Sequence, residues 1–186
     1  MNITKTRLNG PVIIEPKVFR DERGFFTESY SKRTFEENGL YYNIVQDNHS
    51  LSVLEGTIRG LHYQINPKAQ TKIVRALRGA VLDVAVDIRR GSPTFGQWVS
   101  VILTAENMRQ FIVPGGFAHG ICTLTPNTEI YYKVDEFYAP ECDRAIRWDD
   151  PELAIDWPYS NPILSEKDRN APFFKEAEIN FTYEEA

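Results

Sequence analysis

Turn-forming residues recur along the chain at short intervals, so only short helices or strands fit between them. Glycine, proline and asparagine cluster at 9–11, 90–93, 114–116 and 125–127. The runs between these clusters are rich in β-branched and aromatic residues, which favour strands. Many short strands with regular turns are typical of a β-sandwich or barrel. The expected strands are residues 12–15, 24–30, 44–51, 57–64, 72–77, 80–88, 97–103, 109–113, 116–124 and 128–134.

Two segments carry helix signals. Ser31 can cap a short helix over residues 32–38, and Ser165 can begin another near the C-terminus. Residues 138–162 are rich in Trp, Asp and Pro, and we expect them to return across the barrel as an ordered, irregular segment. Because no repeat or composition change divides the chain, we expect one domain over residues 1–186. Its class is all-β, a sandwich or barrel with a few short helices.

Charge and composition argue against several classes of protein. With 21 Lys+Arg against 26 Asp+Glu the formal charge is −5, and the pI of about 5.3 argues against non-specific binding of nucleic acid. No apolar run approaches the roughly 18–20 residues of a membrane-spanning helix, and no secretory signal is visible. Cys122 and Cys142 are too few for a disulfide scaffold and fit a reducing cytoplasm. A local cluster of Arg and Lys could still bind an anionic small molecule.

Three histidines, His49, His62 and His119, are the first candidates for a general base near neutral pH. In a strand, His62 shares its face with Gly60 and Gln64, which leaves room for a ligand. This segment alone is explained equally well by a structural histidine and by a catalytic one. A transition-metal site needs three or four convergent His, Cys or carboxylate ligands, and the low number of histidines and cysteines leads us to expect no metal.

Three further polar residues lie on apolar strand faces. Tyr132 alternates in phase with Ile130 and Val134, so its phenol points inward, where it either bonds to backbone or donates a proton. Lys72 begins an apolar face, and such a lysine either extends to the surface or serves an anionic centre. Asp83 lies within an apolar strand and needs a cation or an imidazole as partner. It either orients a histidine or is structural.

Several motifs, weak one by one, form a specific set because of their order along the chain. They are RGFFTE at 23–28, QDN at 46–48, RGLHYQ at 59–64, DIRRGSPTFG at 87–96, PGGFAHG at 114–120, YK at 132–133, IRWDDP at 146–151 and LSEKD at 164–168. With these motifs the chain resembles the dTDP-4-dehydrorhamnose 3,5-epimerases over nearly its whole length. The resemblance implies a cupin-like jelly-roll barrel without metal or cofactor. It also implies a homodimer with exchanged N-terminal strands.

The implied activity is that of an isomerase in dTDP-rhamnose biosynthesis, which converts dTDP-4-dehydro-6-deoxy-D-glucose to dTDP-4-dehydro-L-rhamnose. The C4 keto group acidifies the C–H bonds at C3 and C5, so the reaction needs a base, an acid on the opposite face and a group that holds the enolate oxygen. By resemblance His62 is the base and Tyr132 the acid. Lys72 would stabilise the enolate, and Asp168 would accept a hydrogen bond from His62. The resemblance assigns substrate contacts to Arg23 (from the other subunit), Phe26, Glu28, Gln46, Asp47, Asn48, Arg59, His119, Tyr138, Asp143 and Lys167.

Two features of the sequence disagree with this resemblance. Strict alternation puts Arg59 and His62 on opposite faces, so both serve one site only if Arg59 lies at a strand end or a bulge near Gly60 re-aims it. Asp143 stands where the family is expected to carry a glutamate. Three alternatives stay open: a mono-epimerase acting on C3 or C5 only, an epimerase of another nucleotide-linked keto-sugar such as a heptose, and a non-catalytic barrel that binds a sugar nucleotide.

Overall fold

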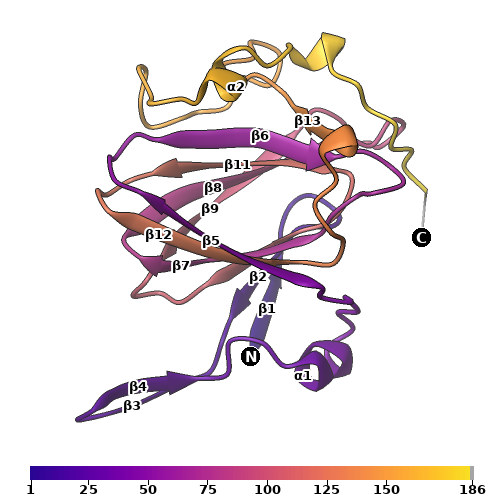
Figure 1. Ribbon diagram of the computed structural model, residues 1–186. Helices are drawn as coiled ribbons and strands as arrows, with labels where there is room; N and C mark the ends of the chain where they lie inside the picture. The colour runs from indigo at the N-terminus through magenta and orange to yellow at the C-terminus, as the bar shows by residue number, and fades with distance from the viewer. Residues whose placement is uncertain (185–186) are drawn as a thin grey trace.

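The computed structural model describes residues 1–184 and consists chiefly of two antiparallel sheets that face each other (Figure 1). The larger sheet has the strand order β1-β2-β10-β7-β12-β5, and the smaller has the order β13-β6-β11-β8-β9. The strands of the larger sheet are β1 (Asn2–Lys5), β2 (Val12–Glu15), β10 (Gln110–Val113), β7 (Lys72–Arg78), β12 (Thr128–Val134) and β5 (Gln46–Ser52). Those of the smaller sheet are β13 (Asp143–Ala145), β6 (Ile58–Gln64), β11 (Phe117–Thr123), β8 (Ala80–Asp87) and β9 (Trp98–Thr104). The all-β class is confirmed.

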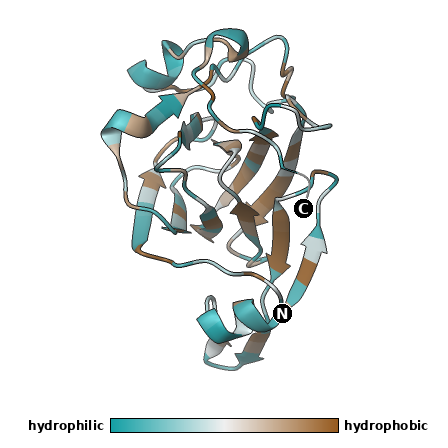
Figure 2. Cartoon of the chain, turned by 90° about the vertical axis from the view of Figure 1, so that its right-hand side faces the viewer, coloured by the Kyte–Doolittle hydropathy of each residue, from teal (hydrophilic) through white to brown (hydrophobic). Residues whose placement is uncertain are grey.

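Apolar side chains from the two inner faces form the core between the sheets. Val74 and Phe111 of the larger sheet pack with Val81 and Leu103 of the smaller one, and all four are fully buried. Alternation places these residues inward, and their burial is the main source of stability in such a sandwich. Figure 2 shows the corresponding hydrophobic colouring on the barrel strands, whereas the N-terminal helix is mostly hydrophilic.

The C-terminal part of the chain covers the outer face of the smaller sheet. Ile146, Leu153 and Phe174 are buried there against residues of β6 and β8. Helix α2 (Glu166–Arg169) lies above β6 in Figure 1. The expected ordered return over residues 138–162 therefore agrees with the structure. It brings α2 to the strand that carries His62.

An N-terminal hairpin projects from the barrel. It consists of β3 (Val18–Asp21) and β4 (Gly24–Thr27), and helix α1 (Lys32–Glu37) follows it (Figure 1). The Ser31 hydroxyl accepts a hydrogen bond from the backbone N–H of Thr34, which confirms the predicted helix cap. The predicted strand 24–30 ends earlier than expected, at Thr27.

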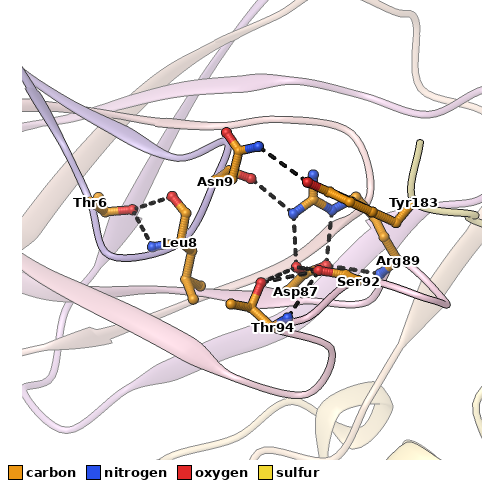
Figure 3. A network of polar contacts seen from close by, with 8 residues as sticks. All are labelled: Thr6, Leu8, Asn9, Asp87, Arg89, Ser92, Thr94 and Tyr183. Carbon is orange, nitrogen blue, oxygen red and sulfur yellow. Dashed lines mark hydrogen bonds and ion pairs between the residues drawn. The ribbon is translucent and has the colours of Figure 1, made fainter. Parts of the chain in front are cut away.

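A buried carboxylate joins the two ends of the chain to the barrel. Both oxygens of Asp87 accept hydrogen bonds from Arg89, and the hydroxyls of Ser92 and Thr94 each donate another to Oδ2 at 2.6 Å (Figure 3). Arg89 also donates to the carbonyl of Asn9, and its guanidinium lies 4.9 Å from the ring centre of Tyr183. These hydrogen bonds outweigh the burial that disfavours the charged carboxylate, so the pKa of Asp87 is lowered.

Candidate active site

The candidate site is a cavity between the two sheets with an apolar part and an adjoining polar part, and Gln46, Asn48 and Tyr138 line the polar one. One part has a volume of about 410 Å³ and the adjoining part about 390 Å³. His62, Lys72 and Tyr132 line both parts. His62 projects from the smaller sheet, whereas Lys72 and Tyr132 project from the larger one. The structure therefore gathers the four residues predicted to be catalytic, because Asp168 lies at the same place.

His62 and Asp168 form a hydrogen-bonded pair across 106 residues of sequence. Nε2 of His62 lies 2.5 Å from Oδ1 of Asp168. Asp168 is 2% exposed, and its backbone N–H donates to the Ser165 hydroxyl at the start of α2. Burial opposes ionisation of Asp168, but the hydrogen bonds from His62 and Ser165 outweigh it and lower the pKa of the carboxyl. Because a carboxylate only accepts hydrogen bonds, Nε2 carries a proton and Nδ1 is the nitrogen that can act as a base.

A bulge in β6 places Arg59 and His62 in the same cavity. His119 pairs with His62, but Ile121 pairs with Arg59, so β6 has one extra residue over this stretch. A Cβ atom on Gly60 would lie 2.4 Å from the Cα of Gly120, and Gly60 has a φ of +144°. Only glycine allows this close approach of β6 and β11. Of the two conditions that the sequence left open, a strand end at Arg59 or a bulge near Gly60, the structure has the bulge, and it removes the conflict with strict alternation.

Lys72 holds its ammonium group inside the cavity. Nζ donates to the backbone carbonyl of His62 at 3.4 Å. Burial lowers the pKa of Lys72 to about 8, while the carboxylates of Asp143 and Asp83 act in the opposite direction. At neutral pH the group is therefore still mostly a cation, and it can stabilise negative charge on a bound oxygen.

Tyr132 approaches the cavity from β12, opposite His62. Its strand neighbours Ile130 and Val134 are buried, as the predicted alternation requires. Burial raises the pKa of Tyr132, so its hydroxyl stays protonated at neutral pH. A protonated phenol that faces an imidazole across a cavity can supply a proton to the side of a ligand that the imidazole does not reach.

His119 lines the cavity beside His62 and is also bonded to a carboxylate. Its Nε2 lies 2.8 Å from Oδ1 of Asp83, which is fully buried on β8. The sequence left open whether Asp83 pairs with a histidine, and the structure assigns it to His119.

The polar part of the cavity gathers several predicted ligand contacts. Gln46 donates to Asn48 at 2.9 Å, and both side chains line the wall formed by β5. Asp143 accepts a hydrogen bond from the Tyr138 hydroxyl at 3.1 Å and forms an ion pair with Lys167. The shorter carboxylate at position 143 is thus already paired within the chain.

Four predicted contacts lie away from this cavity. Arg23, Phe26 and Glu28 belong to the hairpin and the segment that follows it, where Arg23 pairs with Asp21 and Phe26 is 69% exposed. Asp47 lies on the outer face of β5, where its carboxylate accepts a hydrogen bond from Tyr131 at 2.6 Å. Alternation along the strand explains this result, since Gln46 and Asn48 point inward.

Sequence reasoning missed part of the cavity wall. Ser50 continues the inward phase of Gln46 and Asn48, so alternation along β5 would have identified it. Ile163 and Leu164 come from the irregular C-terminal segment, which gives no periodic signal. In residues 1–184, no group of three or more His, Cys, Asp or Glu is arranged to hold a metal ion. No helix in this part of the chain is long and apolar enough to cross a membrane.

Comparison with known proteins identifies the family. A family profile described as dTDP-4-dehydrorhamnose 3,5-epimerase matches residues 5–176. The enzyme of that name from Shigella flexneri is 52% identical over 179 residues, which are 96% of this chain and 98% of the relative. The crystal structure of the Legionella pneumophila enzyme in complex with dTDP-4-keto-L-rhamnose has a TM-score of 0.94 at 47% identity and covers 99% of each chain. The Bacillus anthracis enzyme, with TDP and pyrophosphate bound, has a TM-score of 0.91 at 53% identity and covers 92% of this chain and 98% of its own. Both the cupin-like jelly-roll fold and the sequence therefore show that the chain belongs to the dTDP-4-dehydrorhamnose 3,5-epimerase family.

Proposed function

We propose that this chain performs the reaction for which its relatives are named, the epimerisation of a dTDP-linked 4-keto-6-deoxyhexose at C3 and C5. The observation that carries this proposal is the His62–Asp168 pair facing Tyr132 across one cavity. The C4 keto group makes the protons at C3 and C5 acidic, so acid–base groups can catalyse both inversions. The substrate is dTDP-4-dehydro-6-deoxy-D-glucose and the product is dTDP-4-dehydro-L-rhamnose.

His62 is the general base in this proposal. Its Nδ1 takes the proton from carbon, and the electron pair moves onto the C4 oxygen to give an enolate. The Asp168 carboxylate fixes the imidazole through Nε2 and stabilises the imidazolium that forms. The Lys72 ammonium attracts the negative charge that develops on the oxygen.

Tyr132 completes the inversion by returning a proton to carbon from the opposite face. The O–H bond breaks, the new C–H bond forms, and the enolate returns to a ketone. The phenolate then regains a proton and the imidazolium loses one, so the enzyme is restored. The same pair can serve C3 and C5 if the sugar ring shifts between the two steps.

The polar part of the cavity supports a role in holding the nucleotide. Tyr138 has an exposed ring, and the amides of Gln46 and Asn48 face the same space. Arg59 lines the apolar part and donates to the backbone carbonyl of Leu51 at 3.2 Å, a contact that is exposed to solvent. A guanidinium there is suited to the diphosphate.

We also propose a homodimer in which N-terminal strands are exchanged. The hairpin carries three exposed rings, Phe19, Phe25 and Phe26, and so much apolar surface on a projecting element favours burial against a second copy. In the exchanged dimer, Arg23 and Glu28 reach the partner's cavity rather than their own. Each copy, residues 1–186, acts as one domain. The two free cysteines, both buried, support a reducing compartment such as the cytoplasm.

Exchange of substrate hydrogens for deuterium tests the proposed reaction. The protein, treated with chelator, is incubated with dTDP-4-keto-6-deoxyglucose in D₂O, and the sugar is followed by NMR with a downstream reductase to trap inversion. We expect deuterium at both C3 and C5. Label at one carbon only would indicate a mono-epimerase. No exchange would reject this substrate and lead to a panel of other keto-sugar nucleotides, among them a heptose, before the non-catalytic barrel is considered.

Variants of the two catalytic groups give the sharper test. His62→Ala should abolish exchange at both carbons, whereas Tyr132→Phe should leave some exchange but impair inversion. The loss of a well-placed acid or base costs about 10²–10⁴-fold. His49→Ala and Tyr131→Phe are matched controls, because His49 bonds to Glu129 and Tyr131 to Asp47 outside the cavity. Near-normal turnover by His62→Ala would show that His62 is not the base.

A further inference from the structure

Asp83 is a buried charge that the acid–base mechanism does not use. It lies in the apolar strand β8 and is fully buried. Its Oδ1 is bonded to His119, but within residues 1–184 its buried Oδ2 has no hydrogen-bond partner. A buried carboxylate with one oxygen unpaired is unfavourable for folding, so a stabilising or functional partner must account for it.

The pair that Asp83 forms has the same chemistry as the catalytic pair beside it. His119 and His62 are direct neighbours in the register of β11 and β6. Each histidine directs Nε2 to the Oδ1 of an aspartate, at 2.8 Å for His119 and 2.5 Å for His62. In both rings Nδ1 is therefore the nitrogen that is free for another contact. The cavity has two imidazoles, each fixed by its own carboxylate.

Lys72 is the cation whose charged form the carboxylate of Asp83 favours. It forms no ion pair in the described part of the chain, and its hydrogen bond goes to a backbone carbonyl. Asp83 and Asp143 are the anions that favour its charged form, and Lys167 opposes it. The charged or titratable groups that share the cavity with Lys72 or act on its charge are Arg59, His62 and Tyr63 from β6, Asp83 from β8, His119 from β11, Tyr132 from β12, Tyr138 from the segment before β13, Asp143 from β13, and Lys167 and Asp168 from α2. Asp143 is already paired with Lys167, which leaves Asp83 as the anion whose second oxygen is not neutralised by a donor.

We propose that Asp83 is a positioning residue for the epimerisation, which orients the His119 imidazole through Oδ1 and keeps the Lys72 ammonium protonated through its charge. The inference rests on the proposed role of Lys72 at the C4 oxygen. In an enclosed cavity a carboxylate acts on a nearby cation more strongly than it would in water. His119, held in one orientation, offers Nδ1 to a polar group of the bound sugar.

Asp83→Asn tests the electrostatic part, because the amide keeps the shape and one acceptor oxygen but removes the charge. If Lys72 must be charged, kcat/KM of the wild-type protein should fall on the alkaline side near pH 8. In Asp83→Asn we expect this alkaline limb to lie lower by about half to one pH unit. The pKa of Lys72, followed by NMR of lysine labelled at Cε, should fall by the same amount. Asp87→Asn is the matched control, since Asp87 is equally buried on the same strand but bonds to Arg89 outside the cavity. It should leave both values unchanged.

His119→Gln separates the two actions and remains informative if Asp83→Asn does not fold. It removes the imidazole but keeps the charge of Asp83, so kcat/KM should fall about 10-fold or more while the alkaline limb moves no lower than in the wild type. A downward shift in His119→Gln would overturn the proposal. So would a Lys72 titration in Asp83→Asn that matches the wild type, or an equal shift in Asp87→Asn. If the wild-type protein showed no exchange, the proposed function would fail, but the NMR titration of Lys72 would still decide the role of Asp83.

Discussion

Replacing Lys72 by methionine should stabilise the fold at neutral pH while it abolishes epimerisation. Lys72 shares the inner face of β7 with Val74 and Ala76, which are both buried. The fall of its pKa from 10.5 to about 8 corresponds to about 3 kcal/mol, at about 1.4 kcal/mol for each tenfold change. This is the free energy that the folded protein loses by keeping the ammonium charged. Methionine has a similar length without the charge, but its introduction also removes a cation near Asp83 and Asp143. We therefore expect a net gain of about 1–2 kcal/mol.

The pH dependence of this gain has a definite sign. Between pH 8 and 10.5 the unfolded chain binds the Lys72 proton more tightly than the folded protein does, so wild-type stability rises with pH in this window. Above 10.5 the lysine is neutral in both states and the loss disappears. The difference between the Lys72→Met variant and the wild type should thus be full below pH 8 and small near pH 10.5.

Urea unfolding at pH 7 and at pH 10 measures this difference. Both proteins must be compared at one concentration, because assembly would couple stability to concentration. Lys175→Met is the control, since the Lys175 side chain is 81% exposed and its ion pair with Glu152 is 3.5 Å long. It should change stability by less than about 0.5 kcal/mol. A Lys72→Met variant that is less stable than the wild type at pH 7, or a difference that does not change with pH, would refute the reasoning.

Three further results are expected. Asp168→Asn should lower kcat about 10²–10⁴-fold with little change in KM, measured by steady-state kinetics, because an amide does not stabilise the His62 imidazolium. Gly60→Ala should destabilise the fold by at least about 3 kcal/mol in thermal unfolding, because the new Cβ would lie 2.4 Å from the Cα of Gly120. Gly91→Ala is the control, since φ is also positive there but nothing lies within 4 Å, and its loss should be about 1 kcal/mol. When Arg23→Ala and His62→Ala chains are coexpressed, about a quarter of the wild-type activity should return if the N-terminal strands are exchanged. About half of the dimers are then mixed, and each mixed dimer has one intact site of two. If Arg23 acted within its own chain, the mixture would stay inactive.

Local patterns in the sequence predicted the barrel well and its edges poorly. The strand at 128–134 has the predicted bounds, and its inward phase correctly placed Tyr132. β1, β3 and β13 were not predicted. β1 and β3 are short and mostly exposed, so they lack the apolar alternation that identifies a strand. β13 has three residues and exists because it pairs with β6.

Local sequence patterns also predicted some features of the site, whereas contacts between residues far apart in the sequence were not predictable from them. Tyr132 and Lys72 were placed by alternation, and the conflict between Arg59 and His62 required either a strand end or a bulge, of which the structure has the bulge. The contact between His62 and Asp168 joins a central strand to a short C-terminal helix, and no periodicity connects residues so far apart. It was available only through the resemblance. The same resemblance grouped Asp47 with its neighbours, although alternation turns its side chain to the outer face.

The two-sheet fold itself accounts for the stereochemistry. Inversion at carbon needs a base on one face of a sugar ring and an acid on the opposite face, because the proton must return from the side opposite to the one it left. The smaller sheet contributes His62, His119 and Asp83, and helix α2 adds Asp168, whereas the larger sheet contributes Lys72 and Tyr132. In the proposed mechanism, a ring held between the sheets meets His62 as the base on one face and Tyr132 as the acid on the other. The packed core on which these strands rest keeps the two groups at a fixed separation, which is what catalysis by positioned groups requires.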